Sequence, residues 1–416
     1  MFSTHVAVRR CTAQNAFCES RVFPERPQRF QLKRTVGTKR YNHRISGRTI
    51  TTVCSAAEKP PSYAPSSTEL EALSRVTGVV VDSMLNELSG GSKPKAATVT
   101  PSFILGVLKS TYGQEQFKSA VAGAVAYDKC KAYEGDQRVN CQLDKAMVNV
   151  GSILAAKVEG RVSTEVDPRI SNDTDAIVKR VESLQTLYTE NKVPADKLLY
   201  AIPGTWEGIQ AVKQLEAKGT QCHVVHVYSL VQAVAAAQAK ASVIQVNVGR
   251  VDDWYKKHPG FIRDPTGPRE DSGLVSDVDP GVCLMAKIYD HVKAANPASQ
   301  VMATGIRTKK QALALAGIDY IVTSSQVVDT LAAAATLSGF NDGLHGGDSA
   351  QDIEVQLSVE SAKAATLSLT ESITQAIFVD ELGYMGFDLL KAGVEGAASN
   401  IERCGPFFSG LAGGQE

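Results

Sequence analysis

The sequence lacks any apolar run long enough to cross a membrane. A transmembrane helix needs about 20 consecutive apolar residues, and no stretch of this chain comes near that length, although 43% of its 416 residues are hydrophobic. We therefore expect a soluble protein with no membrane partner, whose apolar residues supply an ordinary core. The length suits one large domain or two smaller ones.

Metal-binding patterns are also missing. The eight cysteines form no CxxC pair and no Cys/His cluster, so the sequence predicts no metal site and no cofactor. Three cysteines fall in the first 54 residues, and the other five are scattered: Cys130, Cys141, Cys222, Cys283 and Cys404. We expect most of these five to be small buried side chains or free thiols. A regulatory disulfide between Cys130 and Cys141 is the alternative.

Acidic residues are scarce at the start of the chain. Residues 1–54 contain 11 Lys/Arg and two acids, a net charge of +9, which leaves 33 basic and 42 acidic residues, or −9, in the remainder. A basic, hydroxyl-containing start without a hydrophobic block is typical of an organellar transit peptide, and we expect import into the plastid (chloroplast stroma). The alternative is a basic tail that binds nucleic acid. Because the acidic body would repel phosphate backbones, we expect no nucleic-acid partner.

One repeating pattern follows the leader. Residues 58–67 are rich in proline and serine, so we predict a transit peptide at 1–54, a linker at 55–72 and one domain at 73–416. Short β-branched runs then alternate with longer Ala/Leu-rich stretches, which is typical of βα units around a parallel sheet. The predicted strands are 78–82, 96–100, 161–167, 197–202, 223–229, 242–249, 300–304 and 320–324.

Eight strands in this length match a TIM barrel. An open doubly wound sheet is the alternative, but it would carry a glycine-rich phosphate loop after its first strand, and Gly90 and Gly91 form no such loop. We therefore predict an α/β fold, a (β/α)8 TIM barrel with additional C-terminal helices. Predicted helices include 206–217, 230–239 and 309–315, with Gly219 and Gly317 at helix ends, and 358–370 and 386–398 near the C-terminus. Predicted loops are 256–279 and 340–348.

Charged residues follow several predicted strands. Asp82 ends the first, Glu165 lies in the third, and Arg250 and Arg307 follow the sixth and seventh. Functional residues of TIM barrels lie at the carboxyl ends of the strands, so this set indicates an acid/base site beside an anion site. The structural alternatives are a helix N-cap for Asp82, an ion pair between Asp167 and Arg169, and a surface position for Arg250.

Six short motifs occur in order along the domain. They are PS at 101–102, VNVG at 148–151, GRVSTEVDPR at 160–169, TWEGI at 205–209, VGR with DWY at 248–255, and DPGV at 279–282. With these motifs the chain resembles the transaldolase family, from about residue 73 to residue 340 and more weakly beyond. The resemblance implies an enzyme of the pentose phosphate pathway that moves a dihydroxyacetone unit through a Schiff base on a strand-four lysine.

The same resemblance assigns roles to individual residues. Asp82 and Glu165 match the family's proton-transfer carboxylates, and Arg250 and Arg307 match its phosphate-binding arginines. The position of the Schiff-base lysine, however, is occupied by Ala201. Further inward positions where this chain departs from the family are expected to line the pocket: Thr100, His223, Val225, Gln245, Asn247 and Gly305.

An alanine has no amine and cannot form a Schiff base. Lys197 lies four residues earlier, about 13 Å away at the opposite end of the barrel, and Lys157 precedes the third strand. His223 is interpreted either as a new acid/base or as a structural residue. His226 is expected to face the other side of its strand, which argues against a shared metal.

Three functions remain open from the sequence. The first is a transaldolase-like protein of plastid sugar-phosphate metabolism that keeps a sugar-phosphate site but lacks Schiff-base transfer. The second is an active transaldolase, converting sedoheptulose 7-phosphate and glyceraldehyde 3-phosphate to erythrose 4-phosphate and fructose 6-phosphate with a relocated nucleophile. The third is a lyase or isomerase using Asp82, Glu165 and His223. Expected partners are sugar phosphates and either a second copy of the chain or another protein.

Overall fold

The computed structural model describes residues 68–82, 94–109, 115–258, 279–334, 357–358, 362 and 371–413. All of them belong to the unit Ser62–Glu416. The predicted transit peptide, most of the predicted linker, the loop at 340–348, nearly all of the loop at 256–279 and most of the helix at 358–370 lie outside the described residues.

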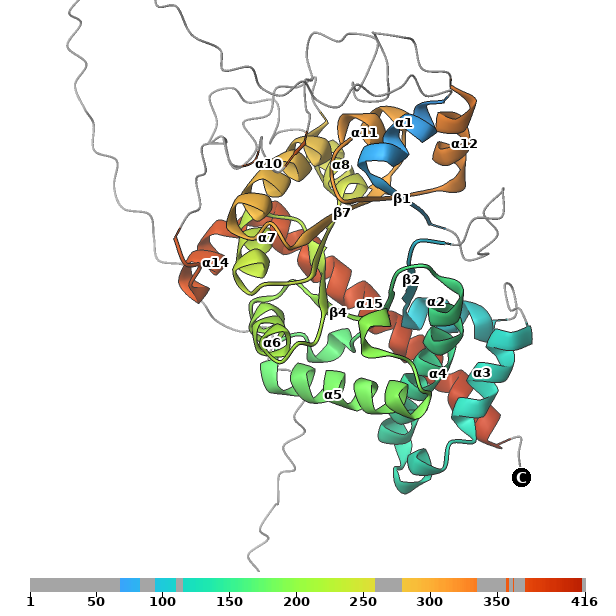
Figure 1. Cartoon of the computed structure of the whole chain (residues 1–416). Coiled ribbons are helices and arrows are strands. Elements are labelled where there is room, and N and C mark those ends of the chain that lie inside the picture. Colours follow the sequence, from blue (N-terminus) through green and yellow to red (C-terminus); the bar gives the residue numbers. More distant parts are fainter. Residues whose placement is uncertain are drawn as a thin grey trace, which may run out of the picture. The chain divides into compact units, whose positions relative to one another are not determined.

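Eight parallel strands form one curled sheet (Figure 1), as the sequence predicts. Their bounds are β1 Gly78–Val81, β2 Ala97–Val99, β3 Val162–Glu165, β4 Leu198–Pro203, β5 Cys222–Val227, β6 Val243–Asn247, β7 Gln300–Ile306 and β8 Tyr320–Thr323. The order is β1-β8-β7-β6-β5-β4-β3-β2, so the sequential neighbours β1 and β2 are the two ends of the described ladder. This order, with helices between the strands, is that of a (β/α)8 barrel and confirms the predicted fold class.

The central strands β4 and β5 are buried on both faces, which explains their apolar composition. In β4 all six residues are buried. Ile202 and Val224 on the outer face pack in one cluster with Ile209 and Leu215 of the helix that follows β4. Fully burying a side chain of this size stabilises the fold by about 1.5–3 kcal/mol, so these outward residues hold the helical layer against the sheet.

Helices fill the connections between the strands. They are α1 Glu69–Val76, α2 Pro101–Leu108, α3 Glu115–Val125, α4 Gly135–Lys157, α5 Thr174–Glu190, α6 Trp206–Ala217, α7 Leu230–Gln238, α8 Val248–Lys257, α10 Pro280–Ala295, α11 Lys309–Ala314, α12 Ser325–Ala333, α14 Gln375–Glu381 and α15 Gly383–Gly413. The helices predicted at 206–217, 230–239 and 309–315 are confirmed as α6, α7 and α11. Gly219 and Gly317 have φ values of 82° and 101°, as expected of glycines that end helices. No helix among the described residues is both long and apolar enough to span a membrane.

The helix predicted at 386–398 is confirmed as part of the 31-residue helix α15. It reaches residues that follow two different strands. The Cys404 thiol lies 3.5 Å from the carbonyl oxygen of Pro101, after β2, and Trp254, after β6, donates its indole N–H to Asp388 at 2.9 Å. Helix α15 therefore packs over part of the carboxyl end of the sheet, where the functional residues are predicted.

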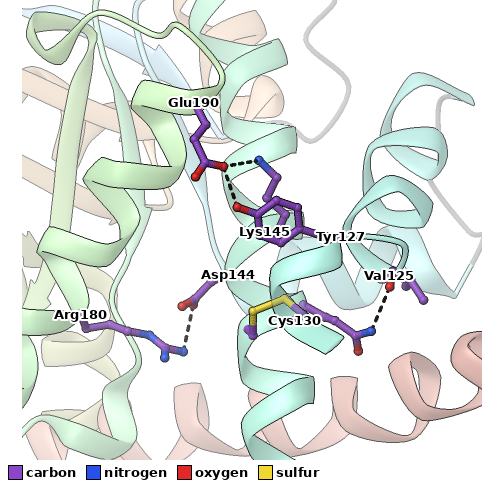
Figure 2. Close-up of a disulfide and its surroundings, with 9 residues drawn as sticks. Val125, Tyr127, Cys130, Asp144, Lys145, Arg180 and Glu190 are labelled. Atoms are coloured by element: carbon purple, nitrogen blue, oxygen red, sulfur yellow. Dashed lines mark hydrogen bonds and ion pairs between the residues drawn. A yellow bond between two sulfur atoms is a disulfide. The ribbon is translucent and has the colours of Figure 1, made fainter. Parts of the chain in front are cut away.

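A disulfide joins Cys130 and Cys141, with the Cα atoms 5.6 Å apart. Figure 2 shows it between the short 3-10 helix η1 Asp128–Ala132 and α4. Next to it, Glu190 accepts hydrogen bonds from the Tyr127 hydroxyl at 2.6 Å and from the Lys129 amine at 2.5 Å. The expectation of free thiols is therefore wrong for Cys130 and Cys141, and the alternative of a disulfide between them is confirmed. The other three cysteines in the described barrel are free, Cys222 and Cys404 being buried and Cys283 half-buried.

Replacing Cys141 with serine is expected to lower the free energy of unfolding. The bond closes a loop with a sequence separation of 11, for which the loss of chain entropy in the unfolded state predicts about 2–3 kcal/mol. Guanidinium titration without reductant measures the change. Cys283→Ser, which removes a free and only half-buried thiol, is the matched control and is expected to change stability by less than about 0.5 kcal/mol. Equal unfolding midpoints for the two variants would contradict the prediction.

Candidate functional site

Side-chain contacts show which strand residues face the barrel interior. The Thr164 hydroxyl lies 2.5 Å from the hydroxyl of Tyr188 on α5, so Thr164 faces outward. Ser163 instead contacts the Nδ1 atom of His223 on β5 at 2.8 Å. Because strand residues alternate between the two faces, Glu165 points inward like Ser163.

The amino end of the interior is closed by polar side chains. Arg161, just before β3, donates to Gln221 at 2.8 Å and to Gln300 at 2.9 Å. These residues come from alternate strands or their starts, as expected for one layer of a TIM-barrel core. The sequence reading did not identify this layer. Both terminal nitrogens of the Arg161 guanidinium are hydrogen-bonded within the layer, so we assign the layer to the core and place the functional end at the opposite side.

Ala201 lies between two of the predicted site residues in the sheet. It is 2% exposed on β4, and in the sheet register it pairs with Glu165 on one side and His223 on the other. Register partners on parallel strands share a face, so Ala201 faces inward. Only a methyl group occupies the position at which the family carries an amine.

The two lysines considered from the sequence lie elsewhere, as predicted. Lys197 donates to the backbone oxygens of Glu159 at 2.8 Å and Gly160 at 3.2 Å, before the start of β3. Lys157, on α4, lies over the ring of Phe117 at 5.6 Å. Both amines are therefore engaged away from the carboxyl end of β4.

Two further lysines are buried, and the sequence reading did not identify them. Lys145 on α4 donates to Asn191 at 3.0 Å, and burial lowers its pKa. Lys293 on α10 donates to the Ser299 carbonyl at 2.7 Å and to Asp319 at 2.9 Å. Neither residue is on a strand, so neither replaces the missing amine.

Glu165 is at the carboxyl end of β3 and is half-buried. Burial, together with the negative charge of Asp167, raises its pKa from 4.5 to about 7. Asp167 itself makes a bidentate contact with Arg169, at 2.9 Å to Nε and 2.6 Å to Nη2. The structural alternative for Asp167 is therefore confirmed, while Glu165 has the pKa of a group that can exchange protons near neutral pH.

Asp82 follows β1 and is exposed. Its backbone N–H donates to the Thr323 carbonyl at 2.7 Å, which continues the pairing of β1 with β8. Asp82 thus lies at the carboxyl end of the sheet, as predicted. The described contacts do not join its side chain to Glu165.

His223 is almost completely buried, at 2% exposure. Burial lowers its pKa from 6.5 to about 4, so the ring is neutral at physiological pH. Ser163 contacts Nδ1, and Gln245, a predicted pocket residue on β6, raises the pKa of the ring through a side-chain hydrogen bond. Val225, also buried, is two residues further along the same strand.

The regular alternation of β5 ends after Val224. The register shifts between Val224 and Val227, and His226 has a left-handed φ of 57°. A Cβ on Gly393 of α15 would lie 2.8 Å from His226 Nδ1, so this glycine allows the helix to approach the histidine. The orientation of His226 therefore cannot be read from strand periodicity. The described residues contain no group of three or more His, Cys, Asp or Glu side chains suited to a metal ion.

Two of the predicted pocket residues act as helix N-caps. Thr100 accepts from Phe103 N–H at 3.1 Å at the start of α2, and Asn247 accepts from Arg250 N–H at 3.0 Å at the start of α8. Gly305 has a φ of 70°, and a Cβ there would lie 2.5 Å from the Asn247 amide oxygen. A side chain at position 305 would collide with Asn247, so the asparagine at 247 requires the glycine at 305. Both residues differ from the family pattern.

Arg307 lies at the carboxyl end of β7 and pairs with Asp253 of α8. Both terminal nitrogens of the guanidinium lie 2.5 Å from the carboxylate oxygens. A Cβ on Gly249 would lie 3.0 Å from Arg307 Nε, so the glycine lets the guanidinium lie against the start of α8. Arg307 is thus oriented by α8 and still 47% exposed.

Arg250 is exposed on the same helix, one residue after Gly249. It has no carboxylate partner within the described ranges, and its charge lowers the pKa of the neighbouring His226. Arg250 and Arg307 therefore follow the paired strands β6 and β7, the first without a carboxylate partner in the described ranges and the second paired with Asp253. A guanidinium at such a position can pair with a phosphate group.

Two carboxyl groups, Asp252 buried and Asp279 half-buried, meet at Gln311 next to Arg307. The Gln311 amide donates to Asp252 at 2.8 Å and to Asp279 at 2.7 Å, and its oxygen accepts from Arg307 N–H at 2.9 Å. Burial and the adjacent Asp279 raise the pKa of Asp252 to about 7. Sequence reasoning noted DPGV as a motif but missed Asp252 and Gln311, which reach it from other segments. The pair fixes the backbone that carries Arg307.

The fold and this site define a class: a (β/α)8-barrel protein with a glutamate and two arginines at the carboxyl ends of its strands. The family model of transaldolase/fructose-6-phosphate aldolase matches residues 82–378, and the chain belongs to that family. It is 38% identical over 267 residues to a transaldolase of Chlamydia felis, covering 64% of this chain and 77% of the relative. It is 35% identical over 266 residues to a transaldolase of Alteromonas mediterranea, covering 64% and 79%.

Proposed function

We propose that this protein is a plastid member of the transaldolase family that binds sugar phosphates and does not form the Schiff base of dihydroxyacetone transfer. The observation that carries the proposal is Ala201, buried on β4 in register with Glu165 and His223. A Schiff base requires a neutral primary amine within reach of the substrate carbonyl. The four lysines considered above are engaged elsewhere.

Retained sugar-phosphate binding is supported by the two arginines. Arg250 brings an unneutralised charge, and Arg307 is exposed and oriented by Asp253. A guanidinium pairs with a phosphate through two parallel hydrogen bonds, which favours this anion over a neutral sugar.

Calorimetry with fructose 6-phosphate and with fructose tests the binding, and borohydride treatment of the complex tests the chemistry. We expect the phosphorylated sugar to bind, the unphosphorylated one to bind at least about tenfold more weakly, and mass spectrometry to find no reduced adduct. An adduct on any lysine would establish the active transaldolase with a relocated nucleophile instead. Absence of binding would make the arginines structural.

Plastid import and a macromolecular partner form part of the proposal. The net charge of +9 in residues 1–54 supports import. A homodimer or protein complex is supported by apolar side chains exposed on α14 and α15, namely Val379, Tyr384 and Phe387. A fluorescent fusion retained in the cytosol would contradict the first point, and a monomer that captures no partner would contradict the second.

A further inference from the structure

We infer that Asp252 and Asp279 are positioning residues of the arginine site: they share one proton that keeps the backbone of Arg307 in place, and loss of this proton weakens anion binding. The inference rests on the proposed function, since the anion is the phosphate group of a sugar phosphate at Arg250 and Arg307. Both carboxyl groups act through Gln311 rather than on the ligand itself.

Gln311 joins the two carboxyl groups to the turn between β7 and α11. Its side chain is buried, at 7% exposure. The amide nitrogen donates to Oδ2 of Asp252 at 2.8 Å and to Oδ2 of Asp279 at 2.7 Å, and the amide oxygen accepts from the Arg307 N–H at 2.9 Å. The position of the Arg307 backbone therefore depends on an amide that two acidic groups hold in place.

Helix α8 holds Arg307 at two points. Asp253 pairs with its guanidinium, and the preceding residue, Asp252, reaches its backbone through Gln311. Arg250 lies in the first turn of the same helix. Both arginines are therefore positioned relative to α8, so a displacement of the contact between Asp252 and Gln311 changes the spacing between them.

The contact between the two carboxyl groups requires a proton. Asp252 is 4% exposed, and its side chain forms a hydrogen bond with that of Asp279. Carboxylates only accept hydrogen bonds, so one of the two groups carries the hydrogen. Both Oδ1 atoms accept backbone N–H groups at the start of α10, from Gly281 and Val282, at 2.9 Å each. The pair is therefore fixed on both sides, and its proton is shared between like charges that cannot easily ionise together.

The shared proton is lost near neutral pH. Burial and the hydrogen bond to Asp279 raise the pKa of Asp252 to about 7. As the pH rises through this value, the pair gains a second negative charge. Repulsion then separates the carboxyl groups that hold the Gln311 amide, and the added charge opposes an anion at Arg307.

Other charged or titratable groups surround the pair. On α8, Lys256 lowers the pKa of Asp252. On α10, burial and the two carboxyl groups raise the pKa of the Cys283 thiol. After β7, pairing with Asp253 and the charge of Asp252 raise the pKa of Arg307. Near neutral pH the carboxyl pair therefore changes its charge while Cys283 and Arg307 do not.

Calorimetry with fructose 6-phosphate at about pH 6 and about pH 8 tests the inference. We expect the affinity of the wild-type protein, relative to that of Asp252→Asn, to fall by about threefold to tenfold over this range, because only the wild-type pair gains a charge. Comparison at each pH cancels the ionisation of the ligand's own phosphate, whose second pKa is about 6. Asp329→Asn, at an exposed position on α12, is the matched control and should keep the wild-type profile.

Urea unfolding over the same range gives a second readout that needs no ligand. Because the pKa of Asp252 in the folded state lies above its ordinary value of 3.8, the proton favours the folded state at low pH, and this advantage is lost as the pH rises through about 7. The unfolding equilibrium constant of the wild type should therefore rise, relative to that of Asp252→Asn, by up to about tenfold per pH unit between about 5 and 7. If Asp252→Asn fails to fold, Asp279→Asn, which keeps an N-cap residue for α10, decides the question through the same two measurements.

The outcomes separate this inference from the proposed function. Binding with the same pH profile in the wild type and in Asp252→Asn would overturn the inference and leave the sugar-phosphate site standing. Absence of binding at both pH values would overturn the proposed function and the inference with it. Parallel unfolding profiles of the two proteins would show that the pair shares no proton, and would also overturn the inference.

Discussion

Replacing Ala201 with lysine is expected to create a covalent adduct that borohydride can trap with fructose 6-phosphate. The new amine would lie on β4 between Glu165 and His223, at 2% exposure. Burial disfavours the ammonium form and lowers a lysine pKa by up to several units, so the amine would be substantially neutral. A neutral amine beside a group with a pKa of about 7 meets both needs of imine formation, a nucleophile and a proton donor.

Full transaldolase turnover is not expected from that single change. His223 and the left-handed Gly305 beside Asn247 alter the surroundings of the carbonyl, so we expect an adduct but a transfer rate at least 100-fold below that of an active relative, since misplaced groups cost rates of this order. Intact-mass spectrometry and a coupled assay measure the two quantities. Ala201→Met adds similar bulk without an amine and should give no adduct. A correctly folded Ala201→Lys variant without an adduct would show that the carbonyl does not reach β4.

Replacing Arg307 with alanine is expected to weaken fructose 6-phosphate binding by about 10- to 150-fold, the value of a hydrogen bond to a charged group. The variant also leaves the Asp253 carboxylate without its partner, at 42% exposure, near the phosphate. Repulsion between unit charges about 4 Å apart in water is worth about 1 kcal/mol, or about fivefold in affinity. The double variant Arg307→Ala with Asp253→Ala should therefore recover about fivefold relative to the single one.

Arg250→Ala should give a loss of comparable size but a different salt dependence. Arg250 has no carboxylate partner in the described ranges, so its removal should flatten the dependence of affinity on ionic strength. Arg307→Lys should keep that dependence, because the charge remains, but it should lose the bidentate geometry of the guanidinium. Calorimetry at two salt concentrations measures both effects. Arg403→Ala, an exposed position on α15, is the control. An unchanged affinity in both Arg250→Ala and Arg307→Ala would refute the phosphate site.

The barrel was accessible to sequence reasoning because it depends on local periodicity. Eight β-branched runs separated by Ala/Leu-rich stretches predicted eight strands, and all eight are present. Helix α6 begins at Trp206 because Thr205 supplies its N-cap, and it ends at Ala217, just before the left-handed Gly219. The disulfide was given only as the alternative, since the approach of Cys130 to Cys141 depends on how η1 packs on α4.

The candidate site was predicted less completely. Glu165, Arg250 and Arg307 could be assigned from motifs next to strand ends. The carboxyl pair of Asp252 and Asp279 could not be assigned from the sequence. Gln311 joins the two groups, and it lies 59 residues from Asp252 and 32 residues from Asp279. The roles of Thr100 and Asn247 as N-caps likewise depend on where the helices begin.

The sequence by itself determined that this chain folds as a barrel of the transaldolase family and that Ala201 stands where an amine would be required. Periodicity, strand-end charges and motif order are properties of the chain, and an alanine has no amine in any conformation. Only the tertiary structure decided that Ala201 lies in register between Glu165 and His223, and that His223 is buried against Ser163. Those facts depend on strand register and on desolvation, which arise only when residues distant in sequence pack together.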